Sequence, residues 1–199
     1  MKLILASNNV SKLKEMRELL AGLDVEVVSQ REAGCDFEVE ETGETFEENA
    51  YLKAAAVTRA TGCAAVADDS GLMVHALGGA PGIYSARFTG SHEDTDEVRN
   101  LFLLEKLEGE TDRRAKFVSC VCCTFPNGDR ICTRGECRGS IAYAPKGENG
   151  FGYDPLFLTD DYPGLTTAEL SPEEKNAISH RGKAFRQFRE ELRRYHADK

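Results

Sequence analysis

The sequence lacks any hydrophobic run that approaches the roughly 20 apolar residues a membrane-spanning helix needs. Its first apolar stretch ends at polar Ser7, which makes it too short for a signal peptide. It also lacks an excess of positive charge, since its formal net charge is −9. Such a charge repels the phosphate backbone of nucleic acids. We therefore expect a cytoplasmic protein that binds neither membranes nor nucleic acids, while a local basic pocket for a small phosphate ligand stays compatible with this charge.

Familiar phosphate-binding signatures are missing as well, since neither a Walker A loop nor a G-x-G-x-x-G motif occurs. The chain contains no internal repeat, low-complexity tract or linker. With 199 residues, of which 41% are hydrophobic and 30% charged, it suits a globular protein with one substantial core. We predict a single domain over residues 1–199.

Cysteine is unusually concentrated, because five of the seven cysteines lie in one segment. They are Cys120, Cys122, Cys123, Cys132 and Cys137. Their spacing lacks the paired C-x2-C of zinc sites, and strand alternation would point Cys122 and Cys123 to opposite faces. Without a secretory signal we expect reduced, buried, structural thiols, with a structural zinc site or redox chemistry as the alternatives.

A short apolar run, Ala64 to Ala67, ends in two adjacent carboxylates, Asp68 and Asp69, followed by Ser70-Gly71. The run predicts a buried strand, and Ser70-Gly71 has the composition of a turn that ends it. Ligands of open α/β sheets gather at the carboxyl ends of strands, where carboxylates hold metals or activate water. The alternative is a solvated pair of turn residues.

A phosphate site is indicated near the N-terminus, where a strand over Lys2 to Ala6 leads into a helix that carries Leu13 and Met16. Ser7, Asn9 and Lys12 lie at this junction. Exposed N–H groups and the helix dipole favour an anion there. A plain N-cap beside a solvated lysine is the alternative.

Further elements follow from composition and periodicity. We expect strands over 25–28 and 72–77, a helix after the capping box that starts at Thr45 and carries Lys53, a helix over 91–107, and a hairpin of 115–125 and 130–142 around an Asn-Gly turn. A last helical region starts at Ser171-Pro172 and runs to about Tyr195.

The loop from Glu148 to Phe157 combines glycines and aromatic residues and is too irregular for a helix or strand. Such a loop can wrap a flat ligand, with an aromatic ring stacking on a base, or it can be a tight turn that carries core aromatics. Lys175, His180 and Arg181 form a cluster of possible hydrogen-bond donors further along.

Taken together, these segments resemble the non-canonical purine nucleoside triphosphate pyrophosphatases, the inosine/xanthosine triphosphatases also called the Ham1-like family. The motifs that carry the resemblance span nearly the whole chain in the family's order. They are Ser7-x-Asn9-x-x-Lys12, Glu41-Thr42-Gly43-x-Thr45-Phe46-x-Glu48-Asn49-Ala50-x-x-Lys53-Ala54, Ala67-Asp68-Asp69-Ser70-Gly71-Leu72, Pro81-Gly82-x-Tyr84-Ser85-Ala86-Arg87, Phe151-Gly152-Tyr153-Asp154-Pro155 and Ser179-His180-Arg181. The cysteine-rich hairpin departs from what we associate with the family.

The resemblance implies an α/β fold with an elongated mixed sheet, flanking helices and two lobes around a central nucleotide-binding cleft, usually as a homodimer. It also implies the site residues. Asp69 is the catalytic base and, with Glu41, a ligand of Mg²⁺. The phosphates are contacted by Ser7, Asn8, Asn9, Val10, Ser11, Lys12, Lys53 and Ser70, with a possible role for Arg87. The purine is bound by Phe151, Gly152, Tyr153, Asp154, Lys175, His180 and Arg181.

The implied activity is hydrolysis of ITP, dITP, XTP and dXTP to the monophosphate and pyrophosphate, which cleanses the nucleotide pool of deaminated purines. Donors on His180 and Arg181 would fit the 6-oxo acceptor of these bases and would be left unpaired by the 6-amino group of adenine. A Maf-like pyrophosphatase for pyrimidine or modified nucleotides is one alternative, and a nucleotide-binding protein without turnover is another.

Overall fold

One six-stranded sheet organises the computed structural model, which describes residues 1–35 and 37–197 except for the side chains of Ser11 and Glu15. The strand order is β2-β1-β3-β4-β5-β6. The strands are β1 (Lys2–Leu5), β2 (Glu26–Ser29), β3 (Ala64–Val74), β4 (Arg114–Thr124), β5 (Arg130–Ile141) and β6 (Phe157–Thr159). β1 runs parallel to β2 and β3, whereas β5 and β6 are antiparallel. The predicted mixed α/β sheet is confirmed.

Two helices begin where the signals at Thr45 and Ser171 predict, whereas the helix predicted over 91–107 begins only at Asp96, after its N-cap Thr95. The helices are α1 (Val10–Leu19), α2 (Phe46–Thr61), α3 (Asp96–Lys106), α4 (Pro172–Ile178) and α5 (His180–Ala197), with 3-10 turns η1 (His75–Leu77), η2 (Gly82–Arg87) and η3 (Asp154–Leu156). Reciprocal capping boxes start α2 at Thr45 and α4 at Ser171. The last helical region is divided at Ser179, whose extended backbone separates α4 from α5. Within the described ranges, none of the helices combines the length and hydropathy needed to cross a bilayer.

The chain folds into two compact units, in agreement with the predicted organisation in two lobes. Unit 1 comprises residues 1–69, 119–134 and 184–199, and unit 2 comprises residues 70–118 and 135–183. Because β3, β4, β5 and α5 each contribute residues to both, neither unit is a continuous piece of sequence.

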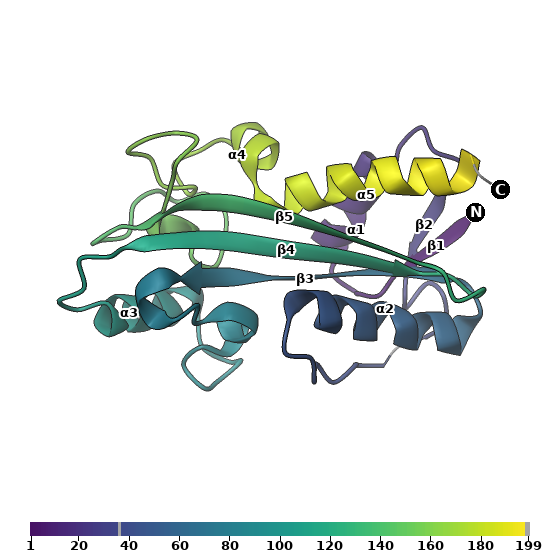
Figure 1. The fold of residues 1–199 in the computed structure, drawn as a ribbon, viewed down its shortest axis with the longest axis horizontal. Coiled ribbons are helices and arrows are strands. Elements are labelled where there is room, and N and C mark those ends of the chain that lie inside the picture. Colours follow the sequence, from purple (N-terminus) through teal and green to yellow (C-terminus); the bar gives the residue numbers. More distant parts are fainter. Residues whose placement is uncertain (36, 198–199) are drawn as a thin grey trace. The chain divides into compact units, whose positions relative to one another are not determined.

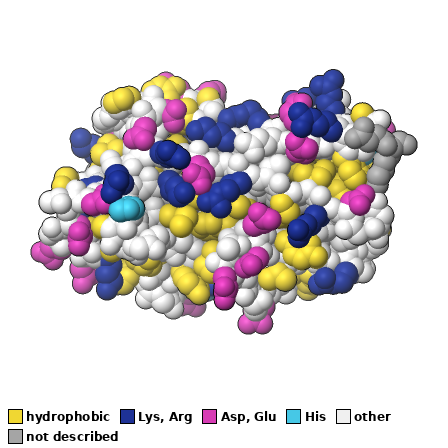
Figure 2. Space-filling view, in the orientation of Figure 1, with side chains coloured by type: hydrophobic (Ala, Val, Ile, Leu, Met, Phe, Trp, Pro, Cys, Tyr) yellow, Lys and Arg dark blue, Asp and Glu magenta, His cyan; other side chains and the backbone are white. Residues whose placement is uncertain are grey.

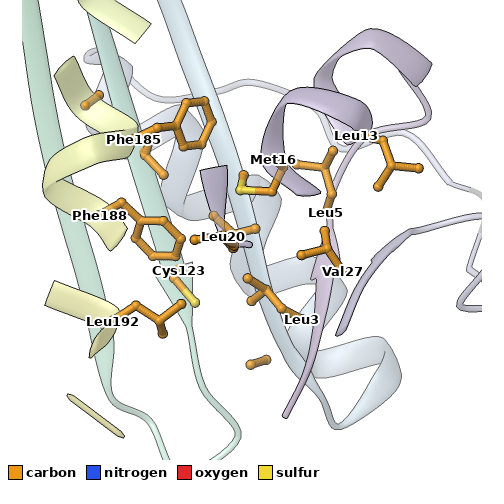
Figure 3. Close-up of a cluster of buried hydrophobic side chains, with 14 of the residues drawn as sticks. Leu3, Leu5, Leu13, Met16, Leu20, Val27, Cys123, Phe185, Phe188 and Leu192 are labelled. Atoms are coloured by element: carbon orange, nitrogen blue, oxygen red, sulfur yellow. The ribbon is translucent and has the colours of Figure 1, made fainter. Parts of the chain in front are cut away.

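The core of unit 1 lies on both faces of its part of the sheet. α1 and α5 cover one face, where Met16 and Phe188 pack with Leu3 and Leu5 (Figure 3). α2 covers the other face, where Val57 packs with Ile4 (Figure 1). Alternate strand residues therefore point toward different helices.

Unit 2 has a separate core that contains residues of β3, α3, β4 and β6. Leu72, Leu103 and Phe157 are fully buried in it. The rings of Phe117 and Phe157 lie 4.5 Å apart between centroids. This packing holds the 3-10 turn η3, and with it Tyr153, against the sheet.

The predicted turn at Ser70-Gly71 is wrong, because β3 continues through it to Val74. The separate strand predicted over 72–77 is the second half of β3, followed by η1. β3 pairs with β1 only over Ala64–Val66 and continues beyond Val66 beside β4, so its place beside β4 overrides the turn preference of Asp, Ser and Gly. Asp68 and Asp69 thus lie in mid-strand and not at a strand end.

The predicted hairpin forms, with the N–H of Phe125 donating to the carbonyl oxygen of Asp129 across the Asn-Gly turn. The expectation of reduced thiols is wrong for two cysteines, since Cys122 and Cys132 form a disulfide across this hairpin. Cys123 points to the other face and is buried in the unit 1 core, as strand alternation predicts.

Candidate functional site

The two adjacent carboxylates of β3 point to opposite faces of the sheet in unit 1. Asp68 follows Ala64 and Val66, which face α1, and Asp69 follows Ala65, which faces α2. Each acid meets a lysine of the helix on its own face. This placement gives each of the two acids a different partner.

Asp69 belongs to an ionic cluster with Lys53 of α2 and Glu41. Lys53 Nζ lies 2.7 Å from Glu41 Oε1 and 3.3 Å from Asp69 Oδ1. Burial raises the pKa of the Asp69 carboxyl, the ammonium of Lys53 lowers it, Glu41 raises it, and the net shift is upward. Burial would lower the pKa of Lys53, but the charges of Asp69 and Glu41 outweigh it and hold that pKa above its ordinary value.

One oxygen of Asp69, Oδ2, is buried and accepts no hydrogen bond from the described residues. A buried carboxylate oxygen without a partner is costly, so it is suited to face a bound cation or water. No group of three or more His, Cys, Asp or Glu side chains in the part of the chain described is arranged to hold a metal. The carboxylate oxygens of Glu41 and Asp69 are nevertheless suitable ligands for a hard cation that takes its other ligands from water and phosphate.

Asp68 is held by Lys12 of α1, whose Nζ lies 2.8 Å from Oδ1 and 3.0 Å from Oδ2. The Asp68 side chain is only 2% exposed. Because both carboxylate oxygens accept from one ammonium, Asp68 positions Lys12 at the start of α1. The lysine is therefore not the solvated side chain of the plain-cap alternative.

The junction of β1 and α1 presents the predicted helix N-terminus. Asn9 is the N-cap, and its side-chain oxygen accepts from the N–H of Lys12 at 3.0 Å. Ser7 Oγ accepts from the N–H of Asn9, and Asn8 Oδ1 accepts from the N–H of Arg31. The first helical residue, Val10, is 79% exposed, which leaves this terminus open to solvent. The backbone of Ser11 follows in α1, and its side chain lies outside the described part.

Asn49 is a supporting residue to which the sequence assigned no role. Its buried side chain accepts from the N–H of Gly43 at 2.8 Å, and its Nδ2, like Asp69 Oδ2, makes no hydrogen bond within the described residues. A Cβ on Gly43 would lie 2.7 Å from Asn49 Oδ1, so only glycine permits this contact. The contact ties the loop that carries Glu41 to the first turn of α2.

In unit 2, the predicted aromatic loop is built around a buried acid. Asp154 is 3% exposed and accepts from Lys175 Nζ at 2.5 Å, from the N–H of Phe151 and from the hydroxyl of Thr167. The ammonium of Lys175 also lies 4.5 Å from the ring centroid of Phe151, whose side chain is 65% exposed. An exposed aromatic ring with a fixed cation beside it offers a surface on which a base can stack.

Two neighbouring loop residues are anchored by partners that the sequence did not indicate. The N–H of Gly152 donates to Asp96 Oδ2 at 2.6 Å, and its carbonyl oxygen accepts from Asn100 Nδ2 at 2.9 Å. The hydroxyl of Tyr153 donates to the carbonyl oxygen of Ser85, and burial raises the pKa of this phenol. Tyr153 is therefore a structural anchor, and Phe151 is the exposed ring of the loop.

His180 and Arg181 begin α5 directly after the break at Ser179. The ring of His180 stacks on Phe117, with centroids 4.8 Å apart and an angle of 15° between the planes. Ser179 Oγ accepts from the N–H of Gly182, which fixes the first turn of the helix. Both donors thus belong to unit 2, as do Lys175 and the aromatic loop.

Ser70 and Arg87 are the two remaining residues for which a phosphate contact was predicted. Ser70 lies within β3 and belongs to unit 2. The guanidinium of Arg87 lies over the ring of Tyr84, 5.1 Å from its centroid, in a cation–π contact.

Comparison with known proteins finds a match to the model of the Ham1 family over residues 3–191. The chain is 51% identical to a dITP/XTP pyrophosphatase of Exiguobacterium sp., over 96% of this chain and 97% of that protein. It is also 51% identical to a dITP/XTP pyrophosphatase of Deinococcus deserti, over 92% of this chain and 85% of that protein. The fold is similar to that of the Ham1 protein of Staphylococcus aureus, with a TM-score of 0.91 and 43% identity over 97% of this chain and 98% of that one. It is also similar to that of a Ham1 protein of Coxiella burnetii, with a TM-score of 0.93 and 43% identity over 98% of this chain and 99% of that one.

Proposed function

We propose that this chain, which belongs to the Ham1 family, hydrolyses the triphosphates of deaminated purines, ITP, dITP, XTP and dXTP, to the nucleoside monophosphate and pyrophosphate. The relatives named dITP/XTP pyrophosphatase support this substrate class. The observation that carries the proposal is the buried Asp69, with an unpaired oxygen, beside Lys53 and Glu41. This arrangement provides a base and a cation site at the same place.

Asp69 is the proposed general base, which takes a proton from the water that attacks the α-phosphorus. Its raised pKa makes it a better proton acceptor than an exposed aspartate, provided that it remains ionised at the working pH. Lys53 holds the carboxylate in place and, with substrate bound, offers positive charge to the leaving pyrophosphate.

Glu41 and Asp69 are the proposed protein ligands of Mg²⁺, a cation that commonly takes one or two carboxylates together with substrate phosphates. When bound, Mg²⁺ would neutralise phosphate charge and favour ionisation of water. Gly43 and Asn49 hold the Glu41 loop near Asp69, so the pair exists before substrate arrives. The chemistry of the oxygen donors therefore fits the ion.

The start of α1 is the proposed binding site for the phosphate chain. Residues 7–12 offer backbone N–H groups, the positive end of the helix dipole and the ammonium of Lys12. Asp68 keeps that ammonium in position through two short contacts. Lys53 and Ser70 are the further proposed phosphate contacts.

Unit 2 is proposed to recognise the base. Phe151 offers the stacking surface, and Lys175 and Asp154 hold the loop that carries it. His180 and Arg181 are the proposed donors to the 6-oxo group, with the His180 ring plane fixed by Phe117. A site built on such donors can discriminate by roughly 10⁴-fold against a base that leaves them unpaired.

The decisive assay measures pyrophosphate release from dITP in the presence of Mg²⁺ and compares it with release from dTTP and from ATP. Preference for dITP over dTTP is expected, and the match to the Ham1 model favours it over a Maf-like preference. Preference for dTTP would contradict the assignment. Absence of turnover with tight dITP binding would instead identify a nucleotide-binding protein.

Asp69→Asn tests the mechanism. Turnover should fall by about 10²- to 10⁴-fold, the usual contribution of a general base, while affinity for dITP changes by only a few-fold. Asp24→Asn removes an exposed carboxylate elsewhere in unit 1 and should retain full activity. Normal turnover by the Asp69 variant would refute the base assignment.

The homodimer, which the resemblance implies, and the cytoplasmic location, which the composition led us to expect, also remain proposals. Sedimentation velocity of the purified protein tests the first, with a mass near twice 21.9 kDa expected. Fluorescence microscopy of a tagged chain in bacterial cells tests the second.

A further inference from the structure

The disulfide of the β4–β5 hairpin lies where strand pairing brings two side chains unusually close. The N–H of Phe125 donates to the carbonyl oxygen of Asp129, so counting back along the antiparallel pair sets Cys122 opposite Cys132. Because hydrogen-bonded pairs alternate with non-hydrogen-bonded pairs, this position is a non-hydrogen-bonded one, where strands approach most closely. The Cα atoms are 4.2 Å apart, so the backbone holds the two sulfurs within bonding reach.

The two cysteines differ in their access to solvent. Cys122 is fully buried, beside the first turn of α2, whereas Cys132 is half-buried. Its sulfur lies on the α2 face of β5, because it is bonded to Cys122, whose Sγ contacts the carbonyl oxygen of Glu47 in α2. A reagent in solution can therefore reach Cys132 first, and Cys122 only through it.

The strand around Cys132 carries positive charge in a protein whose net charge is −9. Arg130 and Arg134 stand two positions on either side of Cys132 on β5, so all three side chains share the face that α2 covers. The guanidinium of Arg130 accordingly lies over the ring of Tyr51 in α2, 5.6 Å from its centroid. Arg186 and Arg194 of α5 line a groove along the other face of β5, and Figure 2 shows dark-blue Lys and Arg side chains over α5, with fewer Asp and Glu side chains among them. Guanidinium groups near a cysteine favour its thiolate, and a basic surface favours an anionic reaction partner.

We propose that Cys122 and Cys132 form a redox-active dithiol, oxidised and reduced at Cys132, between Arg130 and Arg134, by an anionic low-molecular-weight disulfide and thiol of the glutathione type. The Cys132 thiolate attacks one sulfur of the small disulfide, whose S–S bond breaks and releases one thiolate. Cys122 then loses its proton to solvent, attacks the Cys132 sulfur of the mixed disulfide and expels the second thiolate. The two cysteines lose two electrons, and the small disulfide is reduced to two thiols.

The consequence for the protein is a cross-link in the hairpin that packs against α2. Thr58 of α2 and Thr124 of β4 share a hydrogen bond of 2.6 Å, and Cys123 lies in the unit 1 core. The disulfide joins residues separated by 10 positions, and closing a loop of that length should raise the melting temperature by about 5–10 °C.

The first experiment equilibrates the whole protein in glutathione buffers of varied redox ratio, quenches with acid and alkylates in denaturant before mass spectrometry. The expected result is a form with two fewer alkylated thiols and a higher melting temperature under oxidising conditions. Cys132→Ala should abolish both changes, and Cys63→Ala, which removes a half-buried free thiol, should abolish neither. Full alkylation of the unchanged protein in the most oxidising buffer would overturn the proposal, and so would a bond that maps to other cysteines.

The second experiment tests the role of the flanking arginines by comparing oxidation rates with anionic glutathione disulfide and neutral 2-hydroxyethyl disulfide. Arg134→Glu should slow the first reaction by about threefold to tenfold at low salt and leave the second within twofold. Arg59→Glu makes the same charge change on an exposed residue that does not flank Cys132 and should affect neither. Equal slowing with both disulfides, or no slowing with either, would overturn the preference for an anionic partner.

Discussion

Replacement of Lys53 by methionine tests whether one buried ammonium holds the proposed catalytic carboxylates together. Lys53 Nζ contacts Glu41 at 2.7 Å and Asp69 at 3.3 Å, and its side chain is only 18% exposed. Methionine retains most of the volume and the apolar stem but leaves two neighbouring carboxylates without their shared cation. We expect the variant to fold with reduced stability and with a changed response to pH.

The magnitude follows from two opposing effects. At an effective dielectric constant of about 20, each contact has a Coulomb energy of roughly 5–6 kcal/mol, but desolvation of the ammonium offsets much of this energy. Removal of one partner from a buried ion pair typically costs about 3–5 kcal/mol. Because Glu41 is 27% exposed and water relaxes its charge, we expect a value at the lower end, about 3 kcal/mol at pH 7.

The direction of the pH dependence follows from the pKa of Asp69. Burial raises this pKa, so the folded state binds the proton more tightly than the unfolded state does, and stability falls as pH rises through the interval between the two values. Loss of Lys53 removes a cause that lowers the pKa, so the interval widens and the fall becomes larger. Lys53 itself, with a raised pKa, stabilises the fold throughout the range below about pH 10.4.

Urea denaturation at pH 4 and pH 7 measures both effects. The stability deficit of Lys53→Met should be about 3 kcal/mol at pH 7 and clearly smaller at pH 4, where the carboxylates accept protons. Lys14→Met is the matched control, because Lys14 is 78% exposed in a pair of 3.8 Å and should change stability by less than about 0.5 kcal/mol. An equal deficit at both pH values would refute the electrostatic explanation, and no deficit at either would refute the pairing.

Three further substitutions test the supporting structure. Gly150→Ala would place a Cβ 2.2 Å from Asp154 Oδ2, at a backbone φ of 79° that favours glycine. We expect the KM for dITP to rise by about tenfold while kcat changes little. An unchanged KM would contradict a role of this loop in base binding. Gly43→Ala would crowd Asn49 Oδ1 at 2.7 Å and displace the Glu41 loop, so the Mg²⁺ concentration for half-maximal activity should rise by about 10-fold, as measured by a metal titration. Thr45→Ala removes the N-cap of α2 and should cost about 1 kcal/mol in urea denaturation, and retention of full stability would show that the capping box is dispensable.

The sequence by itself determined most of the local structure in this protein. Its capping boxes start α2 and α4, and its Asn-Gly turn joins β4 and β5. These signals depend on residues a few positions apart, which share hydrogen bonds in any fold that contains them. The motifs also indicated the family, since their order and spacing can be read without coordinates.

Only the tertiary structure decided which partner each of the two acids of β3 meets. Sequence preference ended the strand at Ser70-Gly71, but β3 continues beside β4 to Val74, beyond its pairing with β1. The resulting alternation places Asp68 against Lys12 of α1 and Asp69 against Lys53 of α2. Partners separated by 56 and 16 positions leave no local pattern in the sequence.

The same limit applies to the residues that support the site. Asn49 reaches back to Gly43, and Asp96 and Asn100 of α3 hold Gly152 across more than 50 positions of sequence. The pairing of Cys122 with Cys132 depends on the register of the hairpin, which the turn geometry sets. Local chemistry thus specified the elements and the residue types of the site, and long-range packing specified which partner each side chain meets, because contacts between distant segments exist only after the chain has folded.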